Sequence, residues 1–263
     1  MDFEMQVKRI LEELNLKSQY ESTKTTQKRS LEKQVLYKCS KCKDTGFIEV
    51  IREEGIYYRE CECREIERMR NILEQSGIST EYQKISVNQY KVYSQATQLA
   101  KKAAIDYVMN FEEIKDDRQN SIAFLGQVGA GKTHLSIAIA NALMNRGVPV
   151  RYMPYRDVIT ELKQNMLDEE FYQREIEKYK KAKVLLIDDL FKGKTTEADI
   201  NIMFEIINHR YLARMPIIVS SEYIPERLLA FDGAIGSRII EMCKRYLVVI
   251  QGEENNYRLR GVV

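Results

Sequence analysis

The chain has 263 residues, of which 44% are hydrophobic and 30% charged, a composition that excludes a disordered or fibrous protein and suits one sizeable core with a small additional module. Its 41 basic and 39 acidic side chains give a net charge of +2, so the whole-molecule charge gives no argument for nucleic-acid binding. No apolar stretch approaches the roughly 20 residues that cross a bilayer, and the first residues lack the apolar core of a signal peptide. We therefore expect a cytoplasmic protein with no membrane partner.

The first predicted element is a helix. Residues 3–16 place apolar side chains at helical spacing with charged residues between them. Such an amphipathic helix either packs on its own domain or docks on a partner. The polar, poorly periodic residues 17–30 that follow predict a linker.

Four of the five cysteines cluster next. Cys39 and Cys42 form a C-x-x-C pair, and Cys61 and Cys63 form a C-x-C pair. The residues between the pairs alternate like a β-hairpin, which would bring the four thiols together as a tetrahedral Zn²⁺ site requires. The pattern predicts a structural zinc module over 37–64; the alternative is four reduced thiols on a small hairpin.

Helices are predicted over 64–78 and 94–114, with Ser94 as an N-cap. We place an N-terminal, partner-binding region at 1–80 and an ATPase domain with leading helices at 81–263. From residue 121 onward, apolar runs separated by helical stretches predict an α/β fold with a five-stranded parallel sheet covered on both faces. These runs are 121–125, 148–153, 183–187, 216–220 and 246–250.

The first run leads into a phosphate-binding loop. Residues 126–133 match G-x-x-x-x-G-K-[ST] in full, with a predicted strand before the motif and a predicted helix after it. Backbone N–H groups of such a loop face phosphates; Lys132 would reach the β- and γ-phosphates, and Thr133 would place its hydroxyl on Mg²⁺. The motif therefore predicts binding of ATP with Mg²⁺. The predicted nucleotide-binding residues here are Gly126, Gln127, Val128, Gly129, Ala130, Gly131, Lys132 and Thr133.

The third apolar run ends in two acids. Asp188 lies at the carboxyl end of a predicted strand and is the expected Mg²⁺ partner, while Asp189 is placed to orient the attacking water. The alternative is a pair of acids that caps a helix. Phe191, Lys192 and Lys194 follow on a loop, where an aromatic ring with lysines predicts contact with single-stranded DNA. A solvated connecting loop is the alternative.

Two arginines suggest contact between subunits. Arg238 lies in a small-residue turn entering a helix and is predicted to act as an arginine finger on the ATP site of a neighbouring subunit. This assignment implies self-association through the ATP site; the alternative is a surface salt bridge. Arg210, before the fourth run, could face the same interface, although it is the weaker candidate.

The phosphate-binding loop, "VLLIDDL", "IINHRY" and "GSRI", in this order and spacing, resemble the AAA+ helicase loaders of the DnaC/DnaI type. The related IstB-like transposition ATPases share this pattern. The resemblance covers about 120–263, and residues 39–117 look like the cysteine-bearing front half of loader homologues. It implies an AAA+ core without a C-terminal lid, a front half that binds the replicative DnaB-type helicase, and ATP-dependent delivery of that helicase to single-stranded DNA.

The chain departs from the family pattern at the end of the fourth run. Ser220, Ser221 and Glu222 stand where the family usually has a polar pair followed by Asn, a residue that senses the γ-phosphate. A carboxylate there would repel phosphate, so we expect either that Ser221 takes the sensor position or that Glu222 turns away. The second acid is Asp189, where many AAA+ enzymes have Glu. These departures predict slow hydrolysis, with ATP acting mainly as a switch.

The sequence is compatible with three functions. A helicase loader is favoured. An IstB-like ATPase that assists a transposase on double-stranded DNA is disfavoured by the cysteine module. A small-molecule kinase is disfavoured by Arg238, by the appended cysteine module and by residues 253–263, which are too few to supply a lid or a second sensor arginine.

Overall fold

The computed structural model describes residues 37–52, 55–75 and 84–259. The chain divides into two compact units, Met1–Thr45 and Gly46–Val263, and each is described by itself. The predicted helix over 3–16 and the linker over 17–30 lie outside the described residues, and the boundary predicted between 80 and 81 stays a prediction. In the described part of the first unit, the Asp44 carboxylate accepts the Cys39 amide N–H at 2.8 Å and so stabilises a tight turn.

The second unit begins with the predicted hairpin. Strand β1 (Phe47–Arg52) pairs antiparallel with β2 (Gly55–Glu60). Helix α2 (Glu62–Gln75) follows, and an ion pair of 2.8 Å between Glu65 and Arg151 fastens it to the main sheet. Across the described ranges, no helix is both long and apolar enough to cross a bilayer.

The main sheet has five parallel strands in the order β4-β5-β6-β3-β7, which confirms the predicted sheet. All five lie at the predicted apolar runs; the largest difference is at β5, which continues to Leu190 instead of ending at 187. The strands are β3 (Ile122–Gly126), β4 (Val150–Pro154), β5 (Val184–Leu190), β6 (Ile217–Ser221) and β7 (Leu247–Ile250).

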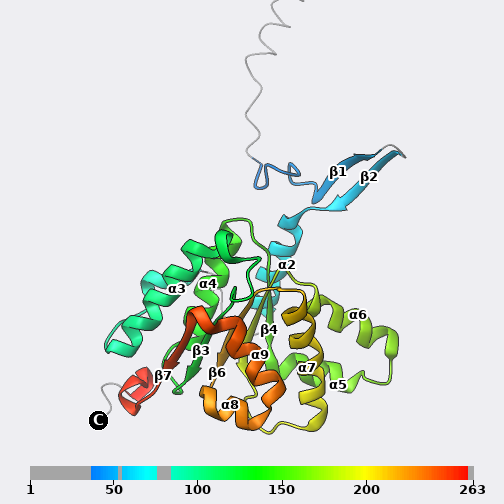
Figure 1. Ribbon diagram of the computed structural model, residues 1–263. Helices are drawn as coiled ribbons and strands as arrows, with labels where there is room; N and C mark the ends of the chain where they lie inside the picture. The colour runs from blue at the N-terminus through cyan, green and yellow to red at the C-terminus, as the bar shows by residue number, and fades with distance from the viewer. Residues whose placement is uncertain (1–36, 53–54, 76–83, 260–263) are drawn as a thin grey trace, which may run out of the picture. The chain divides into compact units, whose positions relative to one another are not determined.

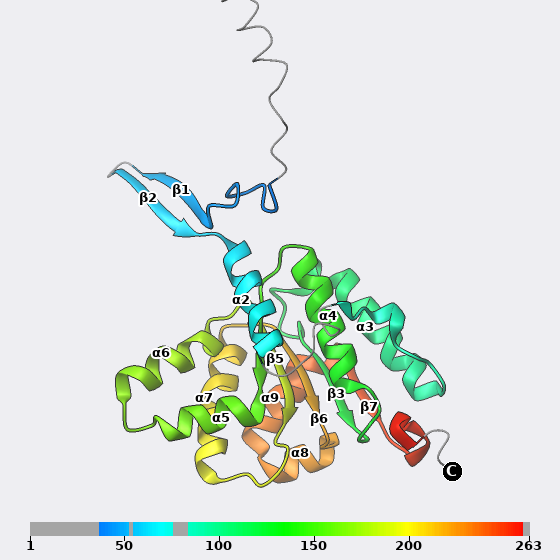
Figure 2. The ribbon, with the colours of Figure 1, turned by 180° about the vertical axis from the view of Figure 1, so that it is seen from behind.

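Helices cover both faces of this sheet (Figures 1 and 2). Successive residues of a strand point to opposite faces. Phe124 therefore packs in one hydrophobic cluster, with the helices α3 and α4, and Leu125 in the other, with the helices α5 to α9. The described helices of this unit are α3 (Gln95–Ile114), α4 (Lys132–Asn145), α5 (Tyr155–Gln164), α6 (Glu169–Lys180), α7 (Glu197–Leu212), α8 (Pro225–Phe231) and α9 (Gly233–Cys243), with short 3₁₀ turns η2 (Val87–Gln89), η3 (Lys244–Tyr246), η4 (Glu253–Asn255) and η5 (Tyr257–Leu259).

Helix α3 begins as predicted. The Ser94 hydroxyl accepts the amide N–H of Thr97, which satisfies one of the amide groups that a helix start leaves without an intrahelical acceptor. The same hydroxyl donates to the side chain of Asn255 at 2.6 Å, so the start of α3 is joined to η4 near the C-terminus.

Arg210 corrects an expectation: it does not face an interface. Its side chain is fully buried at the end of α7, and its guanidinium donates to four backbone carbonyls. These belong to Tyr179, Lys180 and Ala182 at 2.8 to 3.1 Å and to Pro216 at 2.6 Å. Burial lowers the pKa of Arg210 to about 9. The arginine thus links the end of α6 to the chain entering β5 and β6.

Candidate nucleotide-binding site

The glycine-rich loop leaves β3 with backbone angles that glycine adopts readily. Gly126 has φ +105°, and a Cβ there would lie 2.3 Å from the Ile250 carbonyl oxygen. Gly131 has φ +78° at the start of α4, where a Cβ would lie 2.7 Å from the Tyr90 ring. Close approach on both sides therefore requires glycine at these two positions. The loop amides are left at the positive end of α4, as phosphate binding requires.

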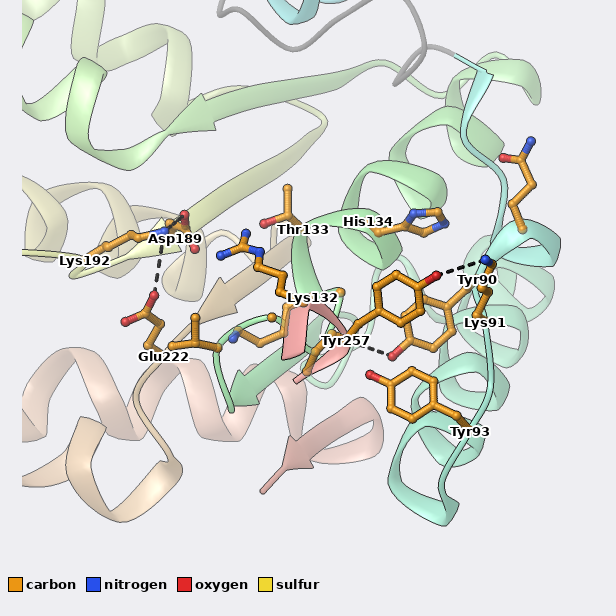
Figure 3. Close-up of a pocket in the computed structure, with 16 residues that line it drawn as sticks. Tyr90, Lys91, Tyr93, Lys132, Thr133, His134, Asp189, Lys192, Glu222 and Tyr257 are labelled. Carbon is orange, nitrogen blue, oxygen red and sulfur yellow. Dashed lines mark hydrogen bonds and ion pairs between the residues drawn. The ribbon is translucent and has the colours of Figure 1, made fainter. Parts of the chain in front are cut away.

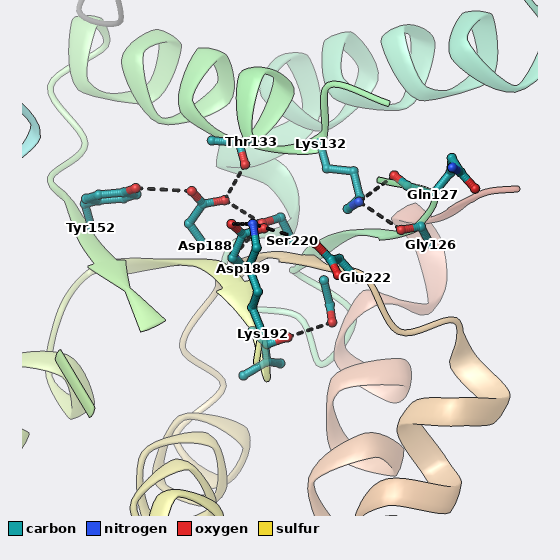
Figure 4. A network of polar contacts seen from close by, with 12 residues as sticks. Gly126, Gln127, Lys132, Thr133, Tyr152, Asp188, Asp189, Lys192, Ser220 and Glu222 are labelled. Carbon is teal, nitrogen blue, oxygen red and sulfur yellow. Dashed lines mark hydrogen bonds and ion pairs between the residues drawn. The ribbon is translucent and has the colours of Figure 1, made fainter. Parts of the chain in front are cut away.

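Lys132 is held by the loop itself. Its Nζ donates to the Gly126 carbonyl at 2.9 Å and to the Gln127 carbonyl at 2.7 Å (Figure 4). The side chain is only 6% exposed, and burial lowers its pKa. Phosphate oxygens would offer it charged acceptors, which bind an ammonium more strongly than neutral carbonyls do.

Asp188 and Thr133, the two predicted Mg²⁺ ligands, are in contact. The Thr133 hydroxyl donates to Asp188 Oδ1 at 2.9 Å, and the hydroxyls of Tyr152 and Ser220 also donate to this carboxylate (Figure 4). The carboxylate is nearly buried, and desolvation raises its pKa against the opposing effect of these hydrogen bonds. A hydroxyl and a carboxylate are oxygen ligands of the kind Mg²⁺ prefers, so the residues fit the ion.

Asp189 lies at the opening of this site. Its backbone has φ +56°, and its amide N–H donates to Ser220 Oγ at 2.8 Å. The Lys192 ammonium is 2.6 Å from Asp189 Oδ2 and 3.6 Å from Glu222 Oε1. The hydrogen bond to Asp189 raises the pKa of Lys192. Neither Ser220 nor Tyr152 was predicted to contact Asp188, because their positions depend on which face of each strand they occupy.

Ser221 does not occupy the sensor position that was predicted for it. It is fully buried, its hydroxyl donates to the Leu190 carbonyl at 2.8 Å, and Oγ accepts the Tyr223 amide N–H. The register of β5 against β6 shifts between Ile187 and Leu190, and alternation along β6 then directs Ser220, not Ser221, to Asp188. Glu222 does not turn away, because it lines the pocket.

The pocket along the loop has a volume of about 350 Å³. Asp189, Lys192 and Glu222 lie at one end, and tyrosines lie at the other, with Lys132 and Thr133 between them (Figure 3). The pocket therefore has a charged end and an aromatic end, an arrangement that suits a nucleoside triphosphate.

The aromatic end comes from segments outside the motif. The Tyr90 hydroxyl donates to the Ala130 carbonyl at 2.7 Å, and the Tyr257 amide N–H donates to the Gly129 carbonyl at 3.0 Å. Lys91 donates to the Tyr257 hydroxyl at 2.9 Å. No short motif marks these tyrosines, and their contribution follows only from the tertiary fold.

The predicted DNA contact of Phe191 is wrong, because the side chain is buried. Its ring is 1% exposed and packs against Phe231 at 4.7 Å and Tyr155 at 5.7 Å between ring centroids. A φ of +59° at Phe191 turns the chain so that the ring enters the core instead of the loop surface. A ring in this position cannot stack on a base. Lys194 remains exposed, whereas Lys192 lines the pocket.

Arg238 lies within α9 and is partly buried. Its Nε donates to Asn208 Oδ1 at 3.0 Å, Nη1 donates to the Ala234 carbonyl at 2.7 Å, and the guanidinium lies 5.2 Å from the centre of the Phe204 ring. It is absent from the described residues that line the pocket. Action on a neighbouring subunit therefore stays a prediction.

The four predicted cysteine ligands cluster. The Sγ atoms of Cys39, Cys42, Cys61 and Cys63 all lie within 4.8 Å of one another. Four sulfur donors at such distances fit a tetrahedral, closed zinc site, in which no position is left for catalysis.

Comparisons with known proteins find similarity to ATP-binding proteins. The sequence profile of a family described as "IstB-like ATP binding protein" matches residues 8–261. The phage-like element PBSX protein XkdC of Bacillus subtilis (strain 168) is 40% identical over 237 residues, which cover 86% of this chain and 88% of XkdC. An insertion-sequence protein of Mycobacterium tuberculosis, Rv3427c, is 31% identical over 109 residues, which cover 41% of this chain and 43% of that protein.

Solved structures share the fold. The DnaC helicase loader superposes with a TM-score of 0.54 at 21% identity, covering 66% of this chain and 100% of that chain. The replication initiator DnaA bound to AMPPCP and single-stranded DNA superposes with a TM-score of 0.54 at 25% identity and 66% coverage of this chain. The matched part spans about half, 51%, of that DnaA chain.

Proposed function

The chain belongs to the IstB-like ATP-binding protein family and has the AAA+ fold, and we propose that it uses ATP to load a replicative DnaB-type helicase onto single-stranded DNA. ATP acts mainly as a switch in this proposal, and hydrolysis is slow. The observation that carries it is the combination, in one chain, of an assembled ATP site and a separate four-cysteine cluster ahead of it. The fold shared with a DnaC helicase loader supports the same function.

The site residues have distinct tasks in this proposal. The loop amides and Lys132 bind the phosphates, and Thr133 and Asp188 hold Mg²⁺, which supplies charge neutralisation at the phosphates when bound. Asp189 orients the attacking water. Arg238 of one subunit completes the site of its neighbour, so self-association through the ATP site is part of the proposal.

The cysteine cluster serves a structural purpose in the same proposal. Cys39, Cys42, Cys61 and Cys63 would hold Zn²⁺, which supplies folding energy to a hairpin that has little core of its own. Most side chains of β1 and every side chain of β2 are exposed. A rigid exposed hairpin suits the binding of the helicase.

An IstB-like ATPase that assists a transposase on double-stranded DNA is the second candidate. The insertion-sequence relative from Mycobacterium tuberculosis favours it. The XkdC relative covers much more of this chain at higher identity and is a protein of a phage-like element. We place the loader first because of the four-cysteine cluster, and we infer from the XkdC relative that it serves the DNA of such an element.

Size-exclusion chromatography with light scattering tests the proposal. The chain is mixed with the replicative helicase of its source, with ATP, with ADP and without nucleotide, and the Lys132→Ala variant is run beside Lys194→Ala as a matched control. A co-eluting complex whose stability responds to ATP, and whose response is lost in Lys132→Ala only, supports the loader. Absence of any complex, together with ATP-dependent assemblies on duplex DNA, would support the transposition candidate instead.

A further inference from the structure

Lys192 lies between two carboxylates at the charged end of the pocket. Its ammonium is 2.6 Å from Asp189 Oδ2 and 3.6 Å from Glu222 Oε1, and all three side chains line the pocket with Lys132 and Thr133 (Figures 3 and 4). Lys192 follows β5, and Glu222 follows the neighbouring strand β6. The lysine therefore joins two strand ends across the place where terminal phosphate oxygens would lie.

The charges at this end do not favour a triphosphate without Lys192. Asp189 and Glu222 both line the pocket, and their negative charges would repel a γ-phosphate. Lys192 is the cation in contact with both acids, and it can offset this repulsion.

Lys192 has the freedom that such a contact requires. Its side chain is 43% exposed, and within the described residues its ion-pair partners are these two carboxylates. Gly193 follows with φ +91°, a conformation that glycine adopts without strain. A short rotation of the side chain can therefore exchange carboxylate oxygens for phosphate oxygens, which are also charged acceptors.

We propose that Lys192 is the γ-phosphate sensor of this ATPase. ATP draws the Lys192 ammonium away from Asp189 and Glu222, whereas ADP leaves it in place. The departure of Lys192 from Asp189 releases the carboxylate that orients water, so the same lysine recognises ATP over ADP and frees Asp189 only when a γ-phosphate is present. The inference rests on ATP binding by this site and not on helicase loading, so either can fail without the other.

Binding measurements test the sensor apart from catalysis. Equilibrium affinities for a non-hydrolysable ATP analogue and for ADP, both with Mg²⁺, are measured on the full chain by calorimetry. Lys192→Ala should weaken the ATP analogue by about tenfold or more, because a charge-assisted hydrogen bond is lost, and should leave ADP affinity unchanged. Lys192→Arg should recover part of the difference, since it keeps the charge.

Two further variants make the test specific. Lys194→Ala, on the same loop but exposed outside the pocket, should keep the preference of the wild type for the ATP analogue. Glu222→Gln should bind the ATP analogue more tightly, because it removes a repulsive charge and leaves only a neutral acceptor to compete for Lys192. Equal losses for ATP analogue and ADP in Lys192→Ala, no loss for either, or the same loss in Lys194→Ala would overturn the proposal. Thermal unfolding of each variant confirms that the comparison is between folded proteins.

Discussion

The Thr133 hydroxyl donates a hydrogen bond of 2.9 Å to Asp188 Oδ1, which joins the first turn of α4 to the end of β5. The two residues come from motifs 55 positions apart, and the parallel sheet brings them to one edge. Because the Asp188 carboxylate is nearly buried, the site holds a poorly solvated anion that a cation would stabilise.

Asp188→Asn should stabilise the nucleotide-free protein at neutral pH and weaken its response to Mg²⁺ and ATP. Desolvation raises the pKa of Asp188, so the folded state binds this proton more tightly than the unfolded state does. The resulting destabilisation is absent below the ordinary Asp pKa of about 3.9 and complete above the raised folded-state pKa. The nucleotide-free variant should therefore be more stable than the wild type at neutral pH, and this advantage should shrink as pH falls through that window.

Urea unfolding across this pH range, with and without Mg²⁺ and ATP, measures both effects. Stabilisation by Mg²⁺ and ATP should be reduced or absent in Asp188→Asn, because the proposed Mg²⁺ ligand is lost. The exposed Asp116→Asn serves as a control and should change neither quantity. An Asp188→Asn protein that is less stable than the wild type at neutral pH, yet still stabilised by Mg²⁺ and ATP, would contradict this account.

The parts of the site that depend on local order could be predicted from the amino-acid pattern. The glycine-rich motif and the acids at the end of an apolar run lie where the pattern predicted, because strand ends and helix starts are set by neighbouring residues. The sheet followed from the same alternation of runs. The position of Asp188 at the end of a strand could therefore be predicted from the sequence.

The parts of the site that could not be predicted depend on contacts between segments that are far apart in the sequence. Whether Ser220 or Ser221 faces Asp188 depends on the register shift between β5 and β6, which leaves no mark in a single sequence. Whether Phe191 points outward depends on a backbone angle of φ +59° that few residues of this type adopt. Tyr257 reaches the loop only because the chain after β7 folds back along it.

Complementation between inactive variants tests Arg238. If it acts on the neighbouring subunit, Arg238→Ala should bind ATP normally but hydrolyse it slowly, and Lys132→Ala should fail to bind ATP. Mixing the two should restore part of the hydrolysis, because Lys132→Ala subunits supply the arginine to intact sites on Arg238→Ala subunits. Steady-state hydrolysis is measured as a function of mixing ratio under conditions of self-association.

The exposed Arg245→Ala, just after α9, is the matched control and should keep full activity. Each Arg238→Ala sample is also checked by thermal unfolding, since this side chain contacts Asn208 and the Phe204 ring. Activity that never exceeds the sum of the two separate variants at any ratio would count against action between subunits.

Cys61→Ser should remove zinc and unfold the cysteine hairpin. Cys61 is 2% exposed within the cluster of four thiols, and structural zinc sites contribute roughly 10–16 kcal/mol of apparent binding energy. Metal analysis of the purified chain should give one zinc per chain for the wild type and for Cys243→Ser. Cys243 lies in the main core, where burial raises the pKa of its thiol.

ATP affinity should remain in Cys61→Ser, because the nucleotide site is built from other elements. Limited proteolysis should then cut the region 37–64 in Cys61→Ser and in wild type treated with a chelator, but not in untreated wild type. Zinc-free wild-type protein with a protected hairpin would show that the thiols alone suffice.

Arg210→Ala should destabilise the fold without changing nucleotide affinity. The substitution removes four hydrogen bonds to backbone carbonyls, of which that of Pro216 keeps the Leu185 amide as another donor, and it opens a cavity, so a loss of about 3–5 kcal/mol in the free energy of unfolding is expected. Urea unfolding measures this loss, and Arg214→Ala, exposed just after α7, should show little change. Ala182 and Pro216 precede β5 and β6, at the sheet edge opposite the pocket, so folded Arg210→Ala should bind ATP as the wild type does. Reduced hydrolysis at unchanged stability would instead assign Arg210 to the subunit interface that the sequence had suggested.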